Sequence, residues 1–319
     1  MSSNYVIHYD GDGGGLGAFL LSYIGASLIS DALGYHLITV NPLICALLSI
    51  DNPVPVCKAL SAKNIFRIND AAAHSQNKVV SLQALREIVS GNSSNCLLYG
   101  RHHMPPIVIY EFLTAVGSYS FATYASLVLS KLNLSTFFGQ IDSKLKSHDL
   151  AVHIRTFFDS ASGRMDFYAS RSLLYGFLVD EISKYSRGTE CYLACDSEHE
   201  WKVAKEVLDH NGIVVPNLRI TALHSSLSHY YGRAILYPER SISQDIELLM
   251  SQSEFKMMHN LRLRLVPTIT DWLSLGKCSL TICTNTSFAI TSCLLQGNKF
   301  ISFPCRSDLL NLSLPMSFV

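Results

Sequence analysis

The sequence lacks an excess of charge of either sign. Lysine and arginine together number 25, as do aspartate and glutamate, and charged residues make up only 16% of the 319 residues. Proteins that bind nucleic acid through electrostatics, or anionic membranes through polybasic segments, carry a basic excess. The even balance argues against a nucleic-acid partner and favours a small or neutral one.

Long apolar runs and paired cysteines are also missing. No run reaches the roughly 20 apolar residues that a membrane-spanning helix needs. The first residues lack the basic start, apolar stretch and cleavage site of a secretory signal. Nine cysteines are scattered without a C-x-x-C pair, which predicts free thiols rather than disulfides or a metal site. We therefore expect a cytoplasmic protein without a membrane span, in the host cytoplasm if the source is viral.

Apolar material is plentiful. Hydrophobic residues make up 48% of the chain, and a chain of this length predicts two domains. Near the N-terminus, a strand pattern at 4–9, a helix pattern at 16–29 and a strand pattern at 35–40 form a β-α-β unit, which indicates a parallel sheet. Further elements are expected as strands at 64–68 and 96–99, a helix at 82–89 and a helical region at 107–146.

The alternation of strands and helices restarts near residue 150. The expected elements are strands at 150–156, 190–195, 212–215, 279–284 and 299–303, and helices at 170–186, 198–210, 242–275 and 286–295. Two such halves predict an α/β protein with two Rossmann-like domains, residues 1–148 and 149–319, facing a ligand cleft at the carboxyl ends of the strands.

A run of glycines, GDGGGLG at 11–17, lies where the first strand ends and the first helix begins. Backbone amides free of side chains and a helix N-terminus together suit a phosphate group. Gly13, Gly15 and Ala18 also fit the G-x-G-x-x-A fingerprint of NAD(P) enzymes. The acidic residue expected after the second strand is replaced by Val40-Asn41-Pro42. The run indicates a phosphate site and leaves open an NAD(P)-dependent oxidoreductase or a structural turn.

The segment AVHIRTF at 151–157 alternates in character. In a strand, His153 and Arg155 share one face, whereas Val152 and Ile154 point the other way. Arginine stays charged at any working pH, and its guanidinium group can bind two oxygens of a phosphate at once. This strand end therefore predicts a cationic site for a leaving nucleoside diphosphate.

Three segments together resemble the GDP-fucose-dependent fucosyltransferase superfamily, which includes the α1,2, α1,6, protein O-fucosyl and plant cell-wall enzymes. They are GDGGGLGAFLLSYIGASLISDALGYHLI, AVHIRTFFD and DWLSLGKCSLTICTNTSFAITSCLLQG. The first is similar to the family's G-G-x-G-N loop, the second to its V-H-I-R motif and the third to its T-x-x-S-x-F region. YLACDSEHEWKVAKE is similar to a segment in which an aspartate follows a strand. The likeness spans nearly the whole chain and implies the GT-B glycosyltransferase fold.

The resemblance implies a nucleotide-sugar site in the second domain and an acceptor side in the first. Arg155 would hold the β-phosphate of the donor, and His153 would support it. The other implied contacts are the loop amides of Gly14 and Gly15, Asp196 near the base or ribose, and Thr286, Ser287 and Phe288 along the nucleotide pocket.

Members of this superfamily invert the anomeric centre in one displacement. The resemblance thus implies an inverting glycosyltransferase acting on an oligosaccharide or glycoprotein glycan, with a base on the acceptor and a cation on the leaving group. Asp12 is the expected base, Asp10 and Asp159 are alternatives, and Arg155 is the expected cation. The reaction is expected to need no metal or other cofactor, although Asp10-Gly11-Asp12 spells a D-x-D and leaves a Mg²⁺ or Mn²⁺ site as an alternative.

Two departures from the family pattern leave the donor open. The glycine loop continues Leu-Gly-Ala where many members have Gly-Asn, and Arg155 stands alone where the α1,6 branch has two arginines. GDP-fucose is the expected donor, with UDP-xylose and GDP-mannose as alternatives. A glycan- or nucleotide-binding module without catalysis is a further alternative, because a fold does not prove an activity.

Overall fold

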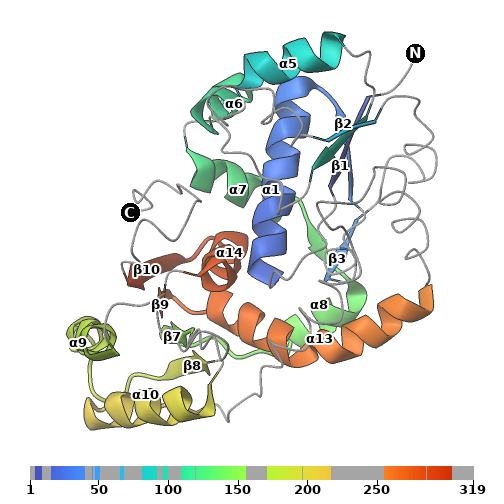
Figure 1. The fold of residues 1–319 in the computed structure, drawn as a ribbon. Coiled ribbons are helices and arrows are strands. Elements are labelled where there is room, and N and C mark those ends of the chain that lie inside the picture. The colour runs from blue at the N-terminus through green and yellow to red at the C-terminus, as the bar shows by residue number, and fades with distance from the viewer. Residues whose placement is uncertain are drawn as a thin grey trace, which may run out of the picture. The chain divides into compact units, whose positions relative to one another are not determined.

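The computed structural model forms two compact units (Figure 1). Unit 1 comprises Met1–Phe137 and Ser225–Arg264, and unit 2 comprises Phe138–His224 and Leu265–Val319. The predicted domain boundary after residue 148 stays a prediction. The residues described are 4–8, 16–39, 45, 47–50, 65–67, 81–91, 96–99, 109–118, 120–155, 171–195, 197–216, 255–284 and 286–303.

Unit 1 contains a parallel sheet of strand order β2-β1-β5-β4. The strands are β1 (Tyr5–His8), β2 (His36–Thr39), β4 (Ile65–Arg67) and β5 (Cys96–Tyr99). All four lie where the apolar patterns predicted strands, and the pairing of β1 with β2 confirms the predicted parallel β-α-β unit. A short antiparallel pair, β3 (Leu48–Ser49) with β6 (Asn133–Leu134), was not predicted.

The central helix of unit 1 is α1 (Leu16–Leu33), which runs beside the sheet in Figure 1. Its described residues are buried on nearly every side, since apolar side chains occur all round the helix. Its C-terminal end is tied to its neighbours by two hydrogen bonds. The hydroxyl of Tyr124 donates to Asp31 at 2.6 Å, and the Arg86 guanidinium donates to the carbonyl of Ala32 at 3.0 Å.

The helical region predicted at 107–146 is confirmed for most of its described residues, which form three helices interrupted by one short strand. It contains α6 (Ile109–Ala115), α7 (Phe121–Ser130), strand β6 and α8 (Thr136–Asp142). Gly117, at φ 74°, adopts a left-handed conformation after α6. Ser120 then caps α7 by accepting the amide of Thr123 at 3.1 Å. Helix α5 (Leu82–Gly91) agrees with its prediction.

Unit 2 contains a second parallel sheet, of order β10-β9-β7-β8. Its strands are β7 (Leu150–Ile154), β8 (Cys191–Cys195), β9 (Leu280–Thr284) and β10 (Lys299–Phe303). The strand predicted at 212–215 is instead a single bridge from Val214 to Glu190. The predicted parallel α/β character is thus confirmed in each unit separately.

Helices cover both faces of the unit 2 sheet (Figure 1). On one face, Leu150, Val152 and Ile154 of β7 join an apolar core with α9 (Arg171–Ile182) and α10 (Glu198–His210). On the other face lie α14 (Ser287–Gln296) and the part of α13 (Phe255–Gly276) that belongs to unit 2, from Leu265 on. The two helices are joined where the Trp272 indole donates to the Thr291 hydroxyl at 3.2 Å. This two-sided cover explains why every residue of β7 is buried.

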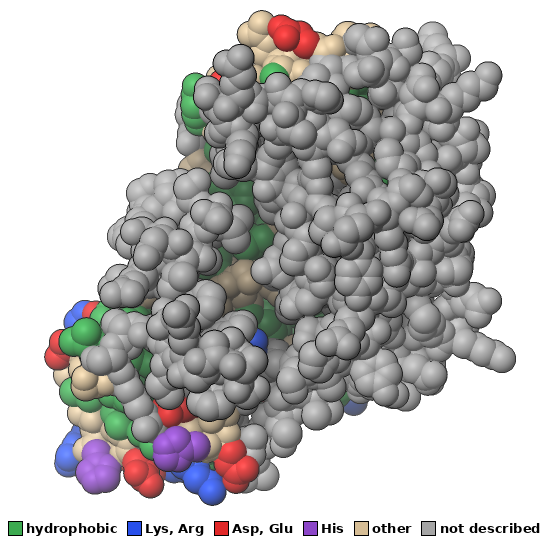
Figure 2. Space-filling model, viewed as in Figure 1, with side chains coloured by type: hydrophobic (Ala, Val, Ile, Leu, Met, Phe, Trp, Pro, Cys, Tyr) green, Lys and Arg blue, Asp and Glu red, His purple; other side chains and the backbone are tan. Residues whose placement is uncertain are grey.

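Charged side chains of both signs gather on the outer surface of α10, at the lower left of Figure 2. Lys202 pairs with Glu198, and Lys205 pairs with Asp209 at 2.6 Å. Such alternation of sign is typical of a solvated helix face. Within the described ranges no helix has the length and apolar character to cross a bilayer.

Candidate active site at the strand ends of unit 2

The carboxyl ends of β7 and β9 bring four polar residues together. His153 and Arg155 come from the end of β7, and Thr284 and Thr286 come from the end of β9. In parallel α/β sheets ligands bind at this edge, where successive strands deliver side chains to one place. The structure therefore gathers residues that are about 130 positions apart in the sequence.

His153 is held on two sides. It is only 3% exposed, its Nδ1 lies 3.3 Å from the Thr286 hydroxyl, and its ring packs against Phe288 with centroids 5.4 Å apart. The predicted alternation of this strand is confirmed, because Val152 and Ile154 belong to the apolar core on the opposite face. His153 therefore fixes the end of β7 against the start of α14.

Thr286 is the N-cap of α14. It has extended backbone angles, and its hydroxyl accepts the amide of Ala289 at 3.5 Å. The first turn of a helix leaves backbone amides without helical partners and carries a partial positive charge, which suits an anion. Ser287 and Phe288 occupy this first turn, so the three predicted residues of this segment lie together with His153.

Arg155 follows the last residue of β7 and is partly exposed. Its backbone N–H donates to the Thr284 hydroxyl at 3.0 Å. Thr284 was not predicted as a site residue. Its place at the end of a predicted strand was the available signal, but the neighbouring strand whose amide it accepts could not be identified from the sequence.

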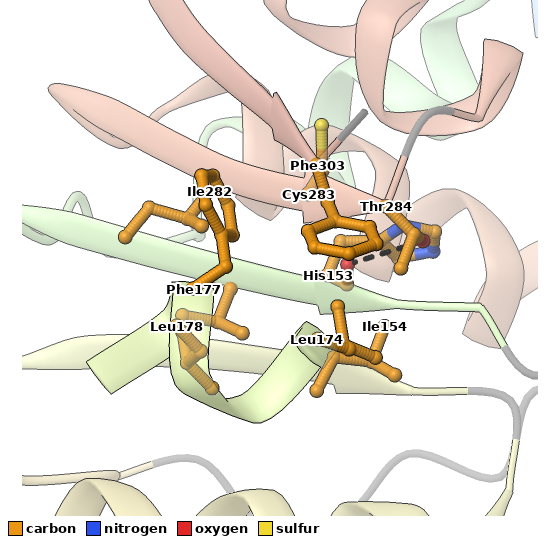
Figure 3. Close-up of a pocket in the computed structure, with 10 residues that line it drawn as sticks. His153, Ile154, Leu174, Phe177, Leu178, Ile282, Cys283, Thr284 and Phe303 are labelled. Atoms are coloured by element: carbon orange, nitrogen blue, oxygen red, sulfur yellow. Dashed lines mark hydrogen bonds between the residues drawn. The ribbon is translucent and has the colours of Figure 1, made fainter. Parts of the chain in front are cut away.

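A small apolar hollow lies beside these strand ends (Figure 3). Leu174, Phe177 and Leu178 of α9 face it from one side, and Phe303 at the end of β10 closes it from another. Burial raises the pKa of the Cys283 thiol well above its ordinary value, so this cysteine is not an activated nucleophile. The hollow offers apolar contacts beside the polar cluster. Its lining is completed by Val152, His153, Ile154, Ile282, Cys283 and Thr284.

Unit 1 carries a comparable histidine, His8, at the carboxyl end of β1. It is fully buried, with Nδ1 2.9 Å from the Thr39 hydroxyl and Nε2 3.0 Å from the Ser22 hydroxyl. The ring of Tyr23 packs edge-on at 5.6 Å. Burial lowers the pKa of His8 to about 3, so the imidazole is neutral at physiological pH. Sequence reasoning missed His8, although a lone polar residue ending an apolar strand was visible.

Several predicted site residues lie outside the described residues. They are Asp12, Gly14, Gly15 and Asp196, together with the alternative bases Asp10 and Asp159. Among the residues that the structure does describe, no three histidine, cysteine, aspartate or glutamate side chains come close enough to hold a metal ion. Cys45, Cys191, Cys195, Cys278, Cys283 and Cys293 are free thiols.

The fold is similar to those of known fucosyltransferases. Arabidopsis thaliana FUT1, in a mutant complex with GDP, matches with a TM-score of 0.52 and 9% identity over 93% of this chain and 70% of that chain. POFUT1 in its apo form matches with a TM-score of 0.50 and 9% identity over 95% and 99% of the two chains. Fucosyltransferase NodZ from Bradyrhizobium matches with a TM-score of 0.49 and 11% identity over 95% and 96%.

No family model and no curated protein sequence matches the chain. At these identities the likeness to FUT1 and POFUT1 is a likeness of fold. It confirms, at that level, the resemblance to fucosyltransferases that the sequence motifs predicted.

Proposed function

We propose that this chain is an inverting glycosyltransferase that moves a sugar from a nucleoside diphosphate donor to a hydroxyl group of an oligosaccharide or glycoprotein glycan. Fucose from a GDP donor is favoured over xylose or another sugar. The observation that carries the proposal is the polar strand end of unit 2. There the Arg155 backbone bonds to Thr284 at the end of β9, and the His153 ring contacts Thr286 at the start of α14. The likeness of fold to FUT1 in complex with GDP supports it.

The chemistry required of this site is stabilisation of a leaving diphosphate. Arg155 supplies a permanent positive charge, and the amides at the start of α14 supply donors that are already oriented. The contact between His153 and Thr286 would hold the end of β7, which carries Arg155, next to the start of α14. Donors held in place before the reaction stabilise developing charge without reorganising, and this stabilisation is the largest contribution to rate enhancement in many enzymes. Ser287 and Phe288 would contact the nucleotide from the first turn of α14.

The remaining roles in the proposal belong to predicted residues. Gly14 and Gly15 would present loop amides, Asp196 would approach the base or ribose, and Asp12 would take the proton of the attacking hydroxyl. The two domains would face one another across the substrate, as in GT-B enzymes. Arg155 would replace a divalent cation, so that no metal is needed.

Nucleotide binding tests the proposal first. Calorimetric titrations with GDP, UDP, GDP-fucose, UDP-xylose and NAD⁺ would be compared between the wild type, Arg155→Ala and Arg187→Ala. Arg187 is an exposed arginine of the same unit that precedes the amino end of β8, away from the strand ends of the site. We expect GDP or UDP to bind the wild type and Arg187→Ala alike, and Arg155→Ala to bind about 10- to 100-fold more weakly.

Sugar transfer is the second test. Wild type, Arg155→Ala and Asp12→Asn would be incubated with the bound donor and a panel of oligosaccharides, with and without EDTA. We expect transfer by the wild type that EDTA leaves unchanged, and a product whose anomeric configuration by NMR is opposite to that of the donor. Binding of NAD⁺ alone would contradict the proposal in favour of an oxidoreductase. Nucleotide binding without transfer to any acceptor would favour a non-catalytic module.

A further inference from the structure

Thr284 connects the ends of two strands just beyond their ladder. The register of β7 and β9 pairs Leu150 with Leu280 and ends with His153 opposite Cys283. Thr284 is the next residue of β9 and is 1% exposed. Its hydroxyl accepts the Arg155 amide at 3.0 Å and donates a longer contact, 3.5 Å, to the His153 carbonyl, which is drawn as a dashed line in Figure 3.

These contacts restrain the backbone on which the Arg155 side chain stands. The N–H of Arg155 lies past the last residue of β7 and past the last pair of the register between β7 and β9. A bond to this N–H restricts the rotation of the peptide plane, and the direction of a side chain follows from the backbone angles at its Cα. Because an arginine side chain is long, a small rotation at the backbone displaces the guanidinium substantially.

We propose that Thr284 is a positioning residue that aims Arg155 at the diphosphate of the donor. This inference rests on the proposed function and adds a residue to its site. Thr284 touches no part of the donor in this scheme and acts only through Arg155. The second restraint on the same segment, between His153 and Thr286, is separate because it engages a side chain rather than the backbone of Arg155.

The chain offers a closely matched control for the loss of a buried threonine hydroxyl. Thr268, in α13 of the same unit, is 2% exposed, and its hydroxyl has no hydrogen-bond partner among the described residues. Thr284→Val and Thr268→Val remove the same atoms from equally buried positions. Only Thr284→Val removes a bond to Arg155, so a difference in nucleotide affinity between the two variants reports the effect of that bond.

The experiment is a double-mutant cycle on nucleoside diphosphate affinity. Calorimetry would use whichever of GDP or UDP binds the wild type, with melting temperatures recorded for every variant. We expect Thr284→Val to weaken binding about 5- to 10-fold, the size of one lost hydrogen bond. Thr284→Ser, which keeps the hydroxyl, and Thr268→Val would stay within about 2-fold of the wild type. In an Arg155→Ala background, Thr284→Val would cause no further loss, because the guanidinium it aims is gone.

Two results would overturn this inference alone. One is wild-type affinity in Thr284→Val while Arg155→Ala is weakened. The other is an equal loss from Thr284→Val with or without the Arg155 side chain, which would mean that the threonine supports the unit in general. Thr284→Ala provides the same comparison if the valine variant does not fold. Failure of the wild type to bind either nucleotide would overturn the proposed function and this inference with it.

Discussion

The hydroxyl of Tyr192 on β8 donates a hydrogen bond of 2.8 Å to the carboxyl group of Asp271 on α13, and both side chains are buried. Burial raises the pKa of Asp271 to about 7, although the bond from Tyr192 partly opposes this shift. In the unfolded chain the same carboxyl ionises near its ordinary pKa of 3.8. The folded state therefore holds a proton that the unfolded state has lost throughout the interval between these two values.

The pH dependence of stability follows from this difference at Asp271. The contribution of the carboxyl to folding is most favourable below pH 4 and is lost as the pH rises toward 7, because only the unfolded state can ionise freely. We expect Asp271→Asn, which stays neutral, to stabilise the protein at pH 8 by about 2 kcal/mol or more and to have little effect at pH 4.5. Chemical denaturation at both pH values measures this, with exposed Asp209→Asn as the control. An equal effect at both pH values would contradict it.

His8 should give a pH dependence of the opposite sign. Its folded-state pKa of about 3 lies below the unfolded value of 6.5, so its contribution is fully present above pH 6.5 and is lost as the pH falls. Between pH 6.5 and 5 the loss should be about 2 kcal/mol, at about 1.4 kcal/mol per pH unit. His8→Gln should destabilise the protein at pH 7.5 and differ less from the wild type at pH 5. Exposed His36→Gln on β2 is the control. If the melting temperatures of His8→Gln and the wild type changed with pH in parallel, this prediction would be wrong.

Thr286 should affect both stability and ligand binding. Replacing an N-cap threonine by alanine costs about 1 kcal/mol of helix stability, and here it also removes the partner of His153. Ser197 is the N-cap of α10 in the same unit, where it accepts the amide of Glu200 at 3.4 Å. We expect Thr286→Ala and Ser197→Ala to lower the melting temperature similarly, and only Thr286→Ala to weaken nucleotide binding. Thr286→Ser should restore both properties. Weakened binding in Ser197→Ala would refute a specific role for Thr286.

Two helical glycines should respond in opposite ways to alanine. A methyl group at Gly276, the last residue of α13, would lie 2.7 Å from the backbone oxygen of Ser292 in α14. Overpacking of this kind costs about 1–3 kcal/mol. Gly176 in α9 is exposed, and a methyl group there would meet nothing within 4 Å. Gly176→Ala should stabilise the protein by about 0.5–1 kcal/mol, because glycine is a poor helix former. Urea denaturation measures the stability of both variants. A loss of stability in Gly176→Ala would contradict the placement of Gly176 on the exposed side of a helix.

Much of the fold could be predicted from local pattern. The helix expected at 198–210 and the strand expected at 299–303 have the bounds of α10 and β10, because capping residues and apolar periodicity are local signals. The strands β3 and β6 could not be predicted, since two residues are too few to show a period. The helical character expected at 107–146 was found, but its division into three helices was not predicted; Gly117, with its left-handed conformation, follows the first of them.

The candidate site was predictable in part for the same reason. The alternation at 151–157 identified His153 and Arg155, and the motif at 286–288 identified the start of α14. Thr284 and His8 were missed because their roles depend on partners from other strands and helices. Thr284 bonds to a residue 129 positions away, and His8 bonds to Thr39 at 31 positions and Ser22 at 14. Such pairings require the strand order, which one sequence does not provide.

The burial of α1 on nearly every side has a consequence for biosynthesis. The helix is complete at Leu33, whereas α7, whose Tyr124 bonds to its end, begins only at Phe121. At translation rates of about 5–20 residues per second, α1 emerges roughly 4–20 seconds before this neighbour. During that interval β1 and β2 are already available to α1, but the part of this apolar helix that packs against α7 stays uncovered. Yield in a foreign host should therefore depend on holdase chaperones that protect nascent chains.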